Sequence, residues 1–151
     1  MDAIDRKILQ IVQNDSSLSI AAIAAKVGLS QTPCWKRIQR LELEGVIRRR
    51  IALLDPQKLG LAITAFVTVE VGDHSRDRLR QFAQTISAME EVMDVYRMAG
   101  DIDYLLRVVV PDTNSFDAFY HRLIEAIPLK SVTSRFALES IKAETALPIR
   151  V

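Results

Sequence analysis

Hydrogen-bonding and cationic side chains gather between residues 26 and 50, where seven lysines and arginines stand against two glutamates. Amide, hydroxyl and guanidinium donors on one helix suit the base edges and phosphates of duplex DNA. The alternative is a basic helix surface that meets only solvent. We predict DNA contacts from Ser30, Gln31, Thr32, Lys36, Arg37 and Arg40, with phosphate contacts from Arg48, Arg49 and Arg50.

Catalytic chemistry has little support in the sequence. The two histidines, His74 and His121, begin no metal-ligand spacing, and there is no Gly-rich phosphate loop, nucleophile elbow or paired-cysteine site. We therefore expect no enzyme, no metal site and no cofactor. Asp94, Asp101 and Asp103 lie close together in the sequence and leave three interpretations open: a cation site, solvated turn acids, or contact with a ligand's ammonium group.

Two further side chains of the basic stretch have reactive or aromatic character. Cys34 has apolar neighbours and no histidine near it in the sequence, which favours a packed, inert thiol over a nucleophile or redox sensor. Trp35 lies beside the apolar face of the same segment. Because tryptophan is usually mostly buried, packing in the core or at the helix rim is favoured over contact with a base.

Helices are predicted to position the basic residues. Apolar residues at spacings of three and four indicate helices over residues 2–13, 20–27 and 31 to about 44. Asp2, Ser19 and Ser30 are the expected N-caps. Because the last two helices are separated by only a short turn at Gly28, the pattern predicts a helix-turn-helix preceded by a further helix.

A second basic element is expected directly after Gly45. Residues 46–54 are rich in β-branched residues, contain Arg48, Arg49 and Arg50, and stop at Asp55-Pro56. This pattern predicts a strand or hairpin, and a strand in that place is a wing. The turn before the third helix and the arginine-rich wing after it favour the DNA interpretation over a solvated face.

The second half of the chain changes to a period of two. The pattern predicts strands over 61–71, 92–98, 104–110 and 132–141, and helices over 76–88 and 114–127. The order β-α-β-β-α-β is that of a ferredoxin-like sandwich, an α+β fold with one antiparallel sheet under two helices. Helices on one side leave the other sheet face uncovered, with Phe66 among its residues, so we expect at least a dimer.

Composition and charge limit the class of protein. The 151 residues are 49% hydrophobic and 26% charged, as in a folded domain, and a single cysteine excludes an intrachain disulfide. We find no signal-peptide pattern and no membrane-length apolar run, so we expect a cytoplasmic protein without membrane contact. Residues 1–54 carry nine basic and five acidic side chains, and the remainder carries eleven and fourteen. This asymmetry indicates one half that meets a polyanion.

Short motifs characteristic of one protein family lie along nearly the whole chain. They are Asp5-Arg6-Lys7-Ile8-Leu9, Val27-Gly28-Leu29-Ser30, Thr32-Pro33-Cys34-Trp35-Lys36-Arg37, Glu44-Gly45-Val46-Ile47, Ala52-Leu53-Leu54-Asp55-Pro56, Met98-Ala99-Gly100-Asp101-Ile102-Asp103-Tyr104-Leu105-Leu106 and Ile141-Lys142. Together they closely resemble the leucine-responsive/asparagine-responsive (Lrp/AsnC) family of bacterial and archaeal transcription regulators. The recognition-helix block and the Gly-Asp-x-Asp-Tyr-Leu-Leu block are the most specific.

The resemblance implies an organisation and a ligand. A winged helix-turn-helix would occupy residues 1–54, a linker 55–60, and an effector-binding and oligomerisation domain of the regulation of amino-acid metabolism (RAM) type 61–151. Homodimers would assemble into tetramers or octamers and bind a small amino-acid effector between dimers. Effector contacts are implied for Met98, Ala99, Gly100, Asp101, Asp103 and Tyr104, and for Thr133 and Ser134 facing a neighbour's loop. Many members have Pro-Gly before the last strand, whereas here Leu129 follows Pro128.

The leading hypothesis is a regulator of double-stranded DNA whose assembly or DNA binding changes with the effector. An amino-acid-binding regulatory subunit that acts through protein partners without DNA is the first alternative. A ferredoxin-like isomerase using the loop from Asp101 to Tyr104 is the second.

Overall fold

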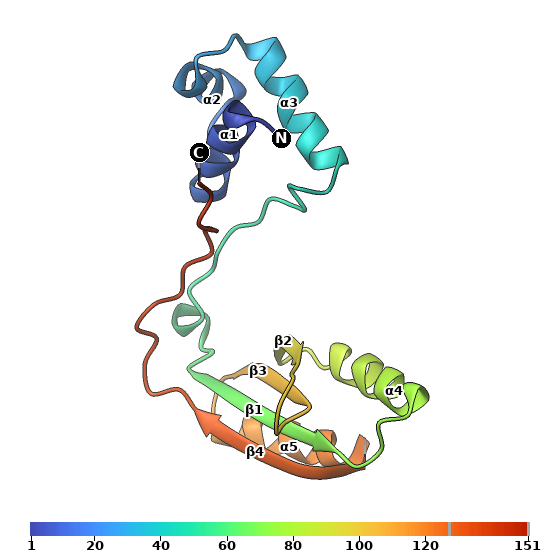
Figure 1. Cartoon of the computed structure of the whole chain (residues 1–151). Coiled ribbons are helices and arrows are strands. Elements are labelled where there is room, and N and C mark those ends of the chain that lie inside the picture. Colours follow the sequence, from blue (N-terminus) through green and yellow to red (C-terminus); the bar gives the residue numbers. More distant parts are fainter. Residues whose placement is uncertain (127, 151) are drawn as a thin grey trace. The chain divides into compact units, whose positions relative to one another are not determined.

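The structure is a computed structural model that describes residues 1–126 and 128–150, and it divides into two compact units (Figure 1). The helical unit consists of Met1–Leu53 together with the chain from Ile141 onward, and the sheet unit is Leu54–Ser140. We call residues 141–150 the tail. The sequence places the tail with the sheet domain at 61–151, whereas in the structure it packs with the helices.

Three helices form the helical unit: α1 (Ala3–Asn14), α2 (Ile20–Val27) and α3 (Gln31–Leu43). Asp2 and Asp5 make a capping box at α1, and the Ser19 hydroxyl accepts the Ala22 amide at α2. Ser30 occupies the predicted N-cap of α3, but its hydroxyl makes no capping hydrogen bond. Gly28 ends α2 with a φ of 73°, in the left-handed region that glycine favours, and so confirms the predicted turn.

The core of this unit uses one side of each helix. Ile8 of α1, Ile23 of α2 and Cys34, Ile38 and Leu41 of α3 are all buried. The inward face predicted for the third helix is therefore confirmed. Burial raises the pKa of the Cys34 thiol, as expected for an inert packed cysteine.

The predicted wing strand is not formed. Residues 46–54 are all described, and none of them lies in a strand. The segment begins with a turn in which the Ile47 amide donates to the Leu41 carbonyl at 3.0 Å, and it then runs on without a hydrogen-bonded ladder. High β propensity is not enough, because a strand needs a neighbouring strand to pair its backbone groups and none pairs with this segment in the described chain.

The sheet unit has the predicted βαββαβ order. Its elements are β1 (Ile63–Val71), α4 (Arg76–Ser87), β2 (Val92–Arg97), β3 (Tyr104–Val110), α5 (Thr113–Ala126) and β4 (Leu129–Phe136), preceded by a short 3₁₀ turn at Gln57–Leu59. The strands pair antiparallel in the order β2-β3-β1-β4. The last strand starts earlier and ends earlier than the predicted 132–141, because it pairs with β1 only as far as Phe136. Ile127, the predicted end of the last helix, lies outside the described residues.

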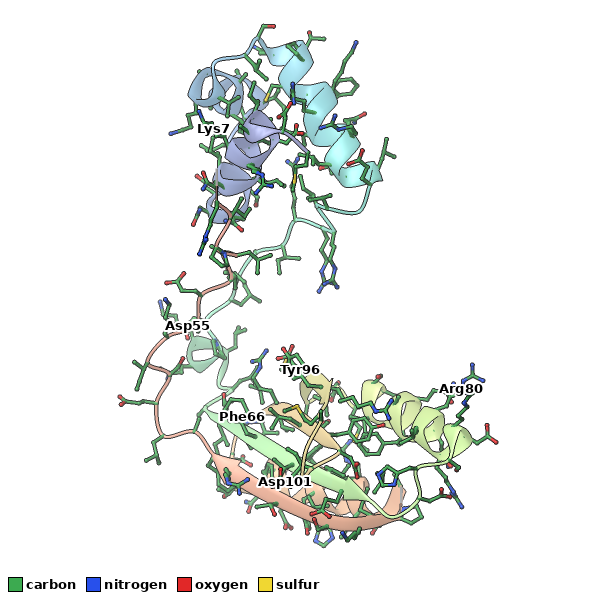
Figure 2. The ribbon with its side chains drawn as sticks, in the orientation of Figure 1. Lys7, Asp55, Phe66, Arg80, Tyr96 and Asp101 are labelled. Carbon is green, nitrogen blue, oxygen red and sulfur yellow. The ribbon has the colours of Figure 1, made fainter. Side chains whose placement is uncertain are left out.

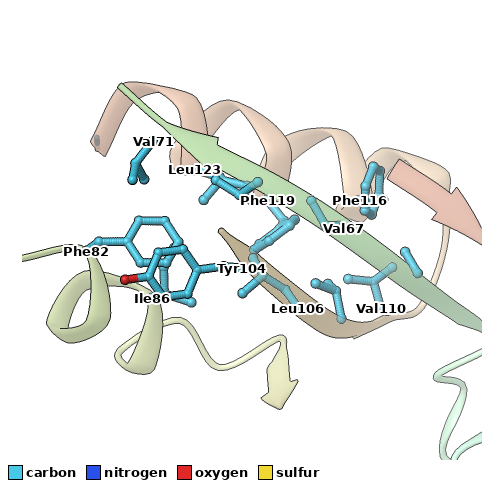
Figure 3. Packing of buried hydrophobic residues seen from close by; sticks show 13 residues of the cluster. Val67, Val71, Phe82, Ile86, Tyr104, Leu106, Val110, Phe116, Phe119 and Leu123 are labelled. Carbon is cyan, nitrogen blue, oxygen red and sulfur yellow. The ribbon is translucent and has the colours of Figure 1, made fainter. Parts of the chain in front are cut away.

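Both helices cover the same face of the sheet. Val67 of β1 and Leu106 of β3 pack against Phe82 of α4 and against Phe119 and Leu123 of α5 (Figure 3). Alternation places the neighbouring strand residues on the opposite face.

The opposite face is open in the monomer, as predicted, and Phe66 is 39% exposed there. It is less apolar than expected. Arg107 on β3 pairs with Asp94 on β2, and Lys130 pairs with Glu70 at 2.8 Å. No helix of the described chain is long and apolar enough to cross a membrane.

Candidate nucleic-acid interface and effector region

The outward face of α3 carries hydrogen-bonding side chains in the open. Thr32 and Lys36 are exposed opposite the buried stripe of Cys34, Ile38 and Leu41, and Gln31 is exposed beside that stripe in the first turn of the helix. Ser30 precedes them and is also exposed. The fold therefore gathers the first four predicted DNA contacts on one accessible surface at the start of the second helix of the helix-turn-helix.

Two of the predicted DNA contacts, Arg37 and Arg40, form ion pairs with carboxylates of the protein itself. An Arg37 guanidinium nitrogen lies 2.6 Å from an Asp2 carboxylate oxygen and 2.8 Å from one of Asp5, and Arg40 lies 2.6 Å from the other Asp5 oxygen. We call these four residues the carboxylate clamp. The Asp5 side chain is 1% exposed, whereas Arg37 and Arg40 are 27% and 46% exposed. The clamp joins the start of α1 to the middle of α3 and so fixes how the outward face is presented.

The electrostatics of the clamp agree with its geometry. The Asp5 amide and then Arg37 lower the pKa of Asp2 to about 2. Burial alone would raise the pKa of Asp5, but the backbone hydrogen bond from Asp2 and the guanidinium of Arg37 lower it overall. Hydrogen bonds to Asp2 and Asp5 raise the pKa of Arg37. All three groups are therefore held in their charged forms.

The three arginines of residues 46–54 differ in whether they form an ion pair. Arg48, Arg49 and Arg50 are all exposed, and Arg50 pairs with Glu42 at 2.9 Å. Within residues 1–126 and 128–150 no ion pair involves Arg48 or Arg49. These two cations follow α3 closely in the chain and are accessible to a phosphate.

Sequence reasoning overlooked Gln39 and left Trp35 between the core and the helix rim. Gln39 is exposed one turn after Lys36, and the helical repeat already indicated that position. Trp35 is 46% exposed and is not part of the core of the helical unit, which leaves the predicted position at the helix rim and not the one in the core. The reason is geometric, because position 35 is rotated by about 100° from the buried Cys34.

The tail was also overlooked as part of the helical unit. It lies along α1, where three long side chains at helical spacing hydrogen-bond its backbone. Gln13 both donates to the Leu147 carbonyl and accepts the Leu147 amide, each at 2.9 Å. The other donors are Gln10 to the Ile149 carbonyl at 2.8 Å and Arg6 to the Arg150 carbonyl at 2.9 Å. Ile149 packs against the core of the helical unit.

The loop predicted to contact an effector joins β2 to β3 in the sheet unit, and Figure 2 labels Asp101 within it. Met98, Ala99, Gly100 and Asp101 are exposed. Gly100 has a φ of 133°, which a side chain would strain. The loop is closed by hydrogen bonds from the Met98 amide to the Asp103 carbonyl at 2.8 Å and from the Asp103 amide to the Val69 carbonyl at 3.0 Å.

Asp103 and Tyr104 have structural partners. The Asp103 carboxylate accepts the Val71 amide at 2.8 Å and lies 2.8 Å from His74, and these two contacts lower its pKa. Tyr104 is buried, and its ring stacks on Phe82 with centroids 4.2 Å apart. Figure 3 shows this pair beside Ile86. Asp103 and Tyr104 therefore hold the end of the loop against the sheet unit. Asp101 is the accessible carboxylate of the loop.

The predicted effector residues do not all lie on one surface of the chain. Thr133 and Ser134 lie on β4, which β1 separates from β3. Ser134 pairs with Val67 and shares its face toward the helices, where its hydroxyl is buried without a partner. Thr133 is exposed on the open face. The predicted effector residues are therefore spread over the β2–β3 loop, the start of β3 and both faces of β4.

The cation interpretation of the three aspartates finds no support in the geometry. Asp94 pairs with Arg107, and Asp103 is held by Val71 and His74. Across the described part of the chain, no three histidine, cysteine, aspartate or glutamate side chains gather as metal ligands.

Comparison with known proteins identifies both units. The family model described as "Winged helix-turn-helix DNA-binding" matches residues 1–48, and that of the "Lrp/AsnC ligand binding domain" matches residues 64–147. The chain is 48% identical over 150 residues to the DNA-binding transcriptional activator DecR of Escherichia coli K12, with 99% of each chain covered. It is 43% identical to the glutamate uptake regulatory protein of Zymomonas mobilis, covering 99% of this chain and 91% of that one.

Solved structures agree with these relatives. An AsnC family transcriptional regulator from Agrobacterium tumefaciens is 55% identical with a TM-score of 0.95, covering 98% of this chain and 97% of that chain. A transcriptional regulator from Neisseria meningitidis, solved as its L-Met complex, is 33% identical with a TM-score of 0.93, covering 98% and 96%. These four proteins are named as regulators, of transcription or of uptake, which is not an enzymatic role. The chain therefore belongs to the Lrp/AsnC family of DNA-binding transcriptional regulators.

Proposed function

We propose that the outward face of α3 binds duplex DNA through Ser30, Gln31, Thr32 and Lys36, while Arg48 and Arg49 bind flanking phosphates. The observation that supports this assignment is the exposure of these donors at the start of α3, with Thr32 and Lys36 opposite its buried stripe. The second helix of a helix-turn-helix enters the major groove with its N-terminal residues toward the bases. Arg37 and Arg40 then act mainly by positioning α3 through the carboxylate clamp.

The test is DNA binding by the full-length protein. A binding site is selected from random duplexes, and affinity is measured by fluorescence anisotropy over a range of salt concentrations. Lys36→Ala is expected to weaken binding and to reduce the slope of log K against log salt by about 0.9 for one lost phosphate contact. Lys58→Ala, which removes an exposed charge outside the helical unit, is the matched control. Equal behaviour of the two variants would contradict the assignment.

We also propose that the effector is an amino acid and that the site lies where the exposed loop of one chain meets β4 of another. Two of the relatives are named for glutamate uptake and for an L-Met complex. The accessible Asp101 carboxylate suits an α-ammonium group, and the loop backbone suits a carboxylate. Thr133 on the open face is the contact supplied by the second chain. The protein would then act in the cytoplasm together with its DNA.

A thermal-shift screen of the twenty amino acids tests this proposal, because a ligand that prefers the folded protein raises its Tm. The amino acid that raises Tm in the wild type should give no shift with Asp101→Asn. Glu125→Gln, an exposed carboxylate change on α5, should leave the shift intact. No shift with any amino acid, or an unchanged shift in Asp101→Asn, would argue against this site.

The open face of the sheet supports assembly into homodimers, and these into tetramers or octamers. Phe66 and Tyr96 are exposed on it and are labelled in Figure 2. A second sheet placed against this face would remove both from water. Phe66→Asp is expected to shift the mass measured by native mass spectrometry toward the monomer. An unchanged mass would exclude Phe66 from the contact between chains.

A further inference from the structure

Trp35 is the single tryptophan of the chain, and the fold leaves it 46% exposed in the middle of α3. Tryptophan is normally highly buried, since its indole ring carries a large apolar area. The core of the helical unit is complete without it, because Cys34, Ile38 and Leu41 fill that side of α3. The exposed part of the ring is therefore available to a partner.

The neighbours of Trp35 on the helix surface indicate the kind of partner. Gln31 and Gln39 lie one turn before and one turn after it, and Thr32 lies three residues before it. All three are exposed, and Lys36 follows directly. The indole is thus surrounded by hydrogen-bond donors and a cation. A docking patch for another protein would surround it with apolar side chains.

We propose that Trp35 and Gln39 extend the DNA-reading face of α3, with the indole packed on a thymine methyl group and Gln39 hydrogen-bonded to the edge of a neighbouring base. The inference rests on the proposed DNA contacts and deepens them. The thymine methyl is the apolar feature of the major groove, and an amide side chain suits adenine. Trp35 thereby supplies sequence preference without adding charge.

Because Trp35 is the single tryptophan, the fluorescence of the wild-type protein reports directly on whether this side chain contacts DNA. Tryptophan emission and quenching by acrylamide are recorded while the selected duplex is added, and anisotropy of the labelled duplex follows binding in the same sample. Binding with quenched or shifted emission and protection from acrylamide is the expected result. Binding with unchanged emission and unchanged quenching overturns the inference alone. No binding at any concentration overturns the proposed DNA contacts as well.

A base substitution tests the contact at the level of one methyl group. Each thymine of the selected site is replaced by deoxyuridine, which lacks that methyl. Wild-type affinity should fall about fourfold at one or two positions, the effect of one buried methyl group. Trp35→Ala should bind the selected site more weakly than wild type and lose nothing further at those positions. The same fourfold loss in Trp35→Ala would show that another residue makes the contact.

Further variants separate this role from folding and charge. Trp35→Phe should retain part of the thymine preference, and Gln39→Ala should relax base preference at an adjacent position. Neither should change the salt slope, because neither removes a charge. Leu43→Ala is the control, since Leu43 is 88% exposed at the far end of α3. Equal thermal unfolding of all variants confirms that they fold, and a Leu43→Ala effect equal to that of Trp35→Ala would overturn the assignment.

Discussion

Asp5 joins more parts of the helical unit than any other carboxylate in it. Its side chain completes the capping box with Asp2 and pairs with both Arg37 and Arg40 while being almost fully buried. A buried charge is tolerated when it is paired and fully hydrogen-bonded, and removing it leaves its partners uncompensated. One side chain therefore sets both the start of α1 and the position of α3.

Asp5→Ala should consequently lower the free energy of unfolding by about 3 kcal/mol, through the lost cap and the lost buried pairing. Urea denaturation followed by circular dichroism measures this change. Asp77→Ala, at an exposed aspartate on α4, is the control and should have a small effect. DNA affinity of Asp5→Ala should fall under conditions where the protein remains folded, because α3 is no longer held. A fully stable Asp5→Ala protein would show that the clamp does not hold the two helices together.

The lowered pKa of Asp2 predicts how stability depends on pH. A carboxyl whose pKa is about 2 when folded and near 3.8 when unfolded stabilises the protein above pH 4. That contribution is lost as the pH falls from about 4 toward 2, where the unfolded state takes up the proton first. The Tm of the wild type should fall through this range, and the fall should be shallower in Asp2→Asn. Parallel curves for the two proteins would contradict this linkage.

Among the elements, regular helices and strands could be predicted and irregular segments could not. Apolar spacing located α1, α2 and the buried stripe of α3, because each helix buries one side. The segment at 46–54 has strand-like composition, but whether it forms a strand depends on a partner that composition does not reveal. The tail shows no periodic spacing of apolar residues. Its hydrogen bonds with the side chains of Gln10 and Gln13 form only once α1 is folded. For Trp35 the sequence left the core and the helix rim open, and the position of residue 35 beside the buried stripe places it at the rim.

The docked tail should stabilise the helical unit. Gln13 makes two hydrogen bonds to Leu147, so Gln13→Ala should lower the free energy of unfolding by about 1 to 2 kcal/mol. Ending the chain after Ser140 should cost more, because it also removes Ile149 from the core. Differential scanning calorimetry measures both changes. Gln84→Ala on the exposed side of α4 is the matched control. Wild-type stability in the shortened protein would show that the tail contributes nothing to this unit.

Considered as a whole, the molecule attracts DNA through the distribution of its charge and not through its total. The net charge is only +1, but nine of the twenty lysines and arginines lie in the first 54 residues, against five of the nineteen acidic residues. The clamp and Glu42 neutralise Arg37, Arg40 and Arg50 inside the protein. Six of the nine are left without an ion pair among the described residues, and Arg48 and Arg49 are the two that follow α3.

This distribution predicts a moderate salt dependence to which Arg48 and Arg49 contribute alongside Lys36. Arg48→Ala and Arg49→Ala should each reduce the slope of log K against log salt by about 0.9, and the double variant by about twice that amount, since each neutralised phosphate releases its counterions. Base preference should survive in both, because phosphate contacts carry no sequence information. Arg80→Ala removes an equal charge from α4 of the sheet unit and should change neither slope nor affinity. If Arg80→Ala and Arg48→Ala reduced the slope equally, attraction would come from net charge, and the division of the chain into a basic DNA-binding unit and an acidic sheet unit would not explain binding.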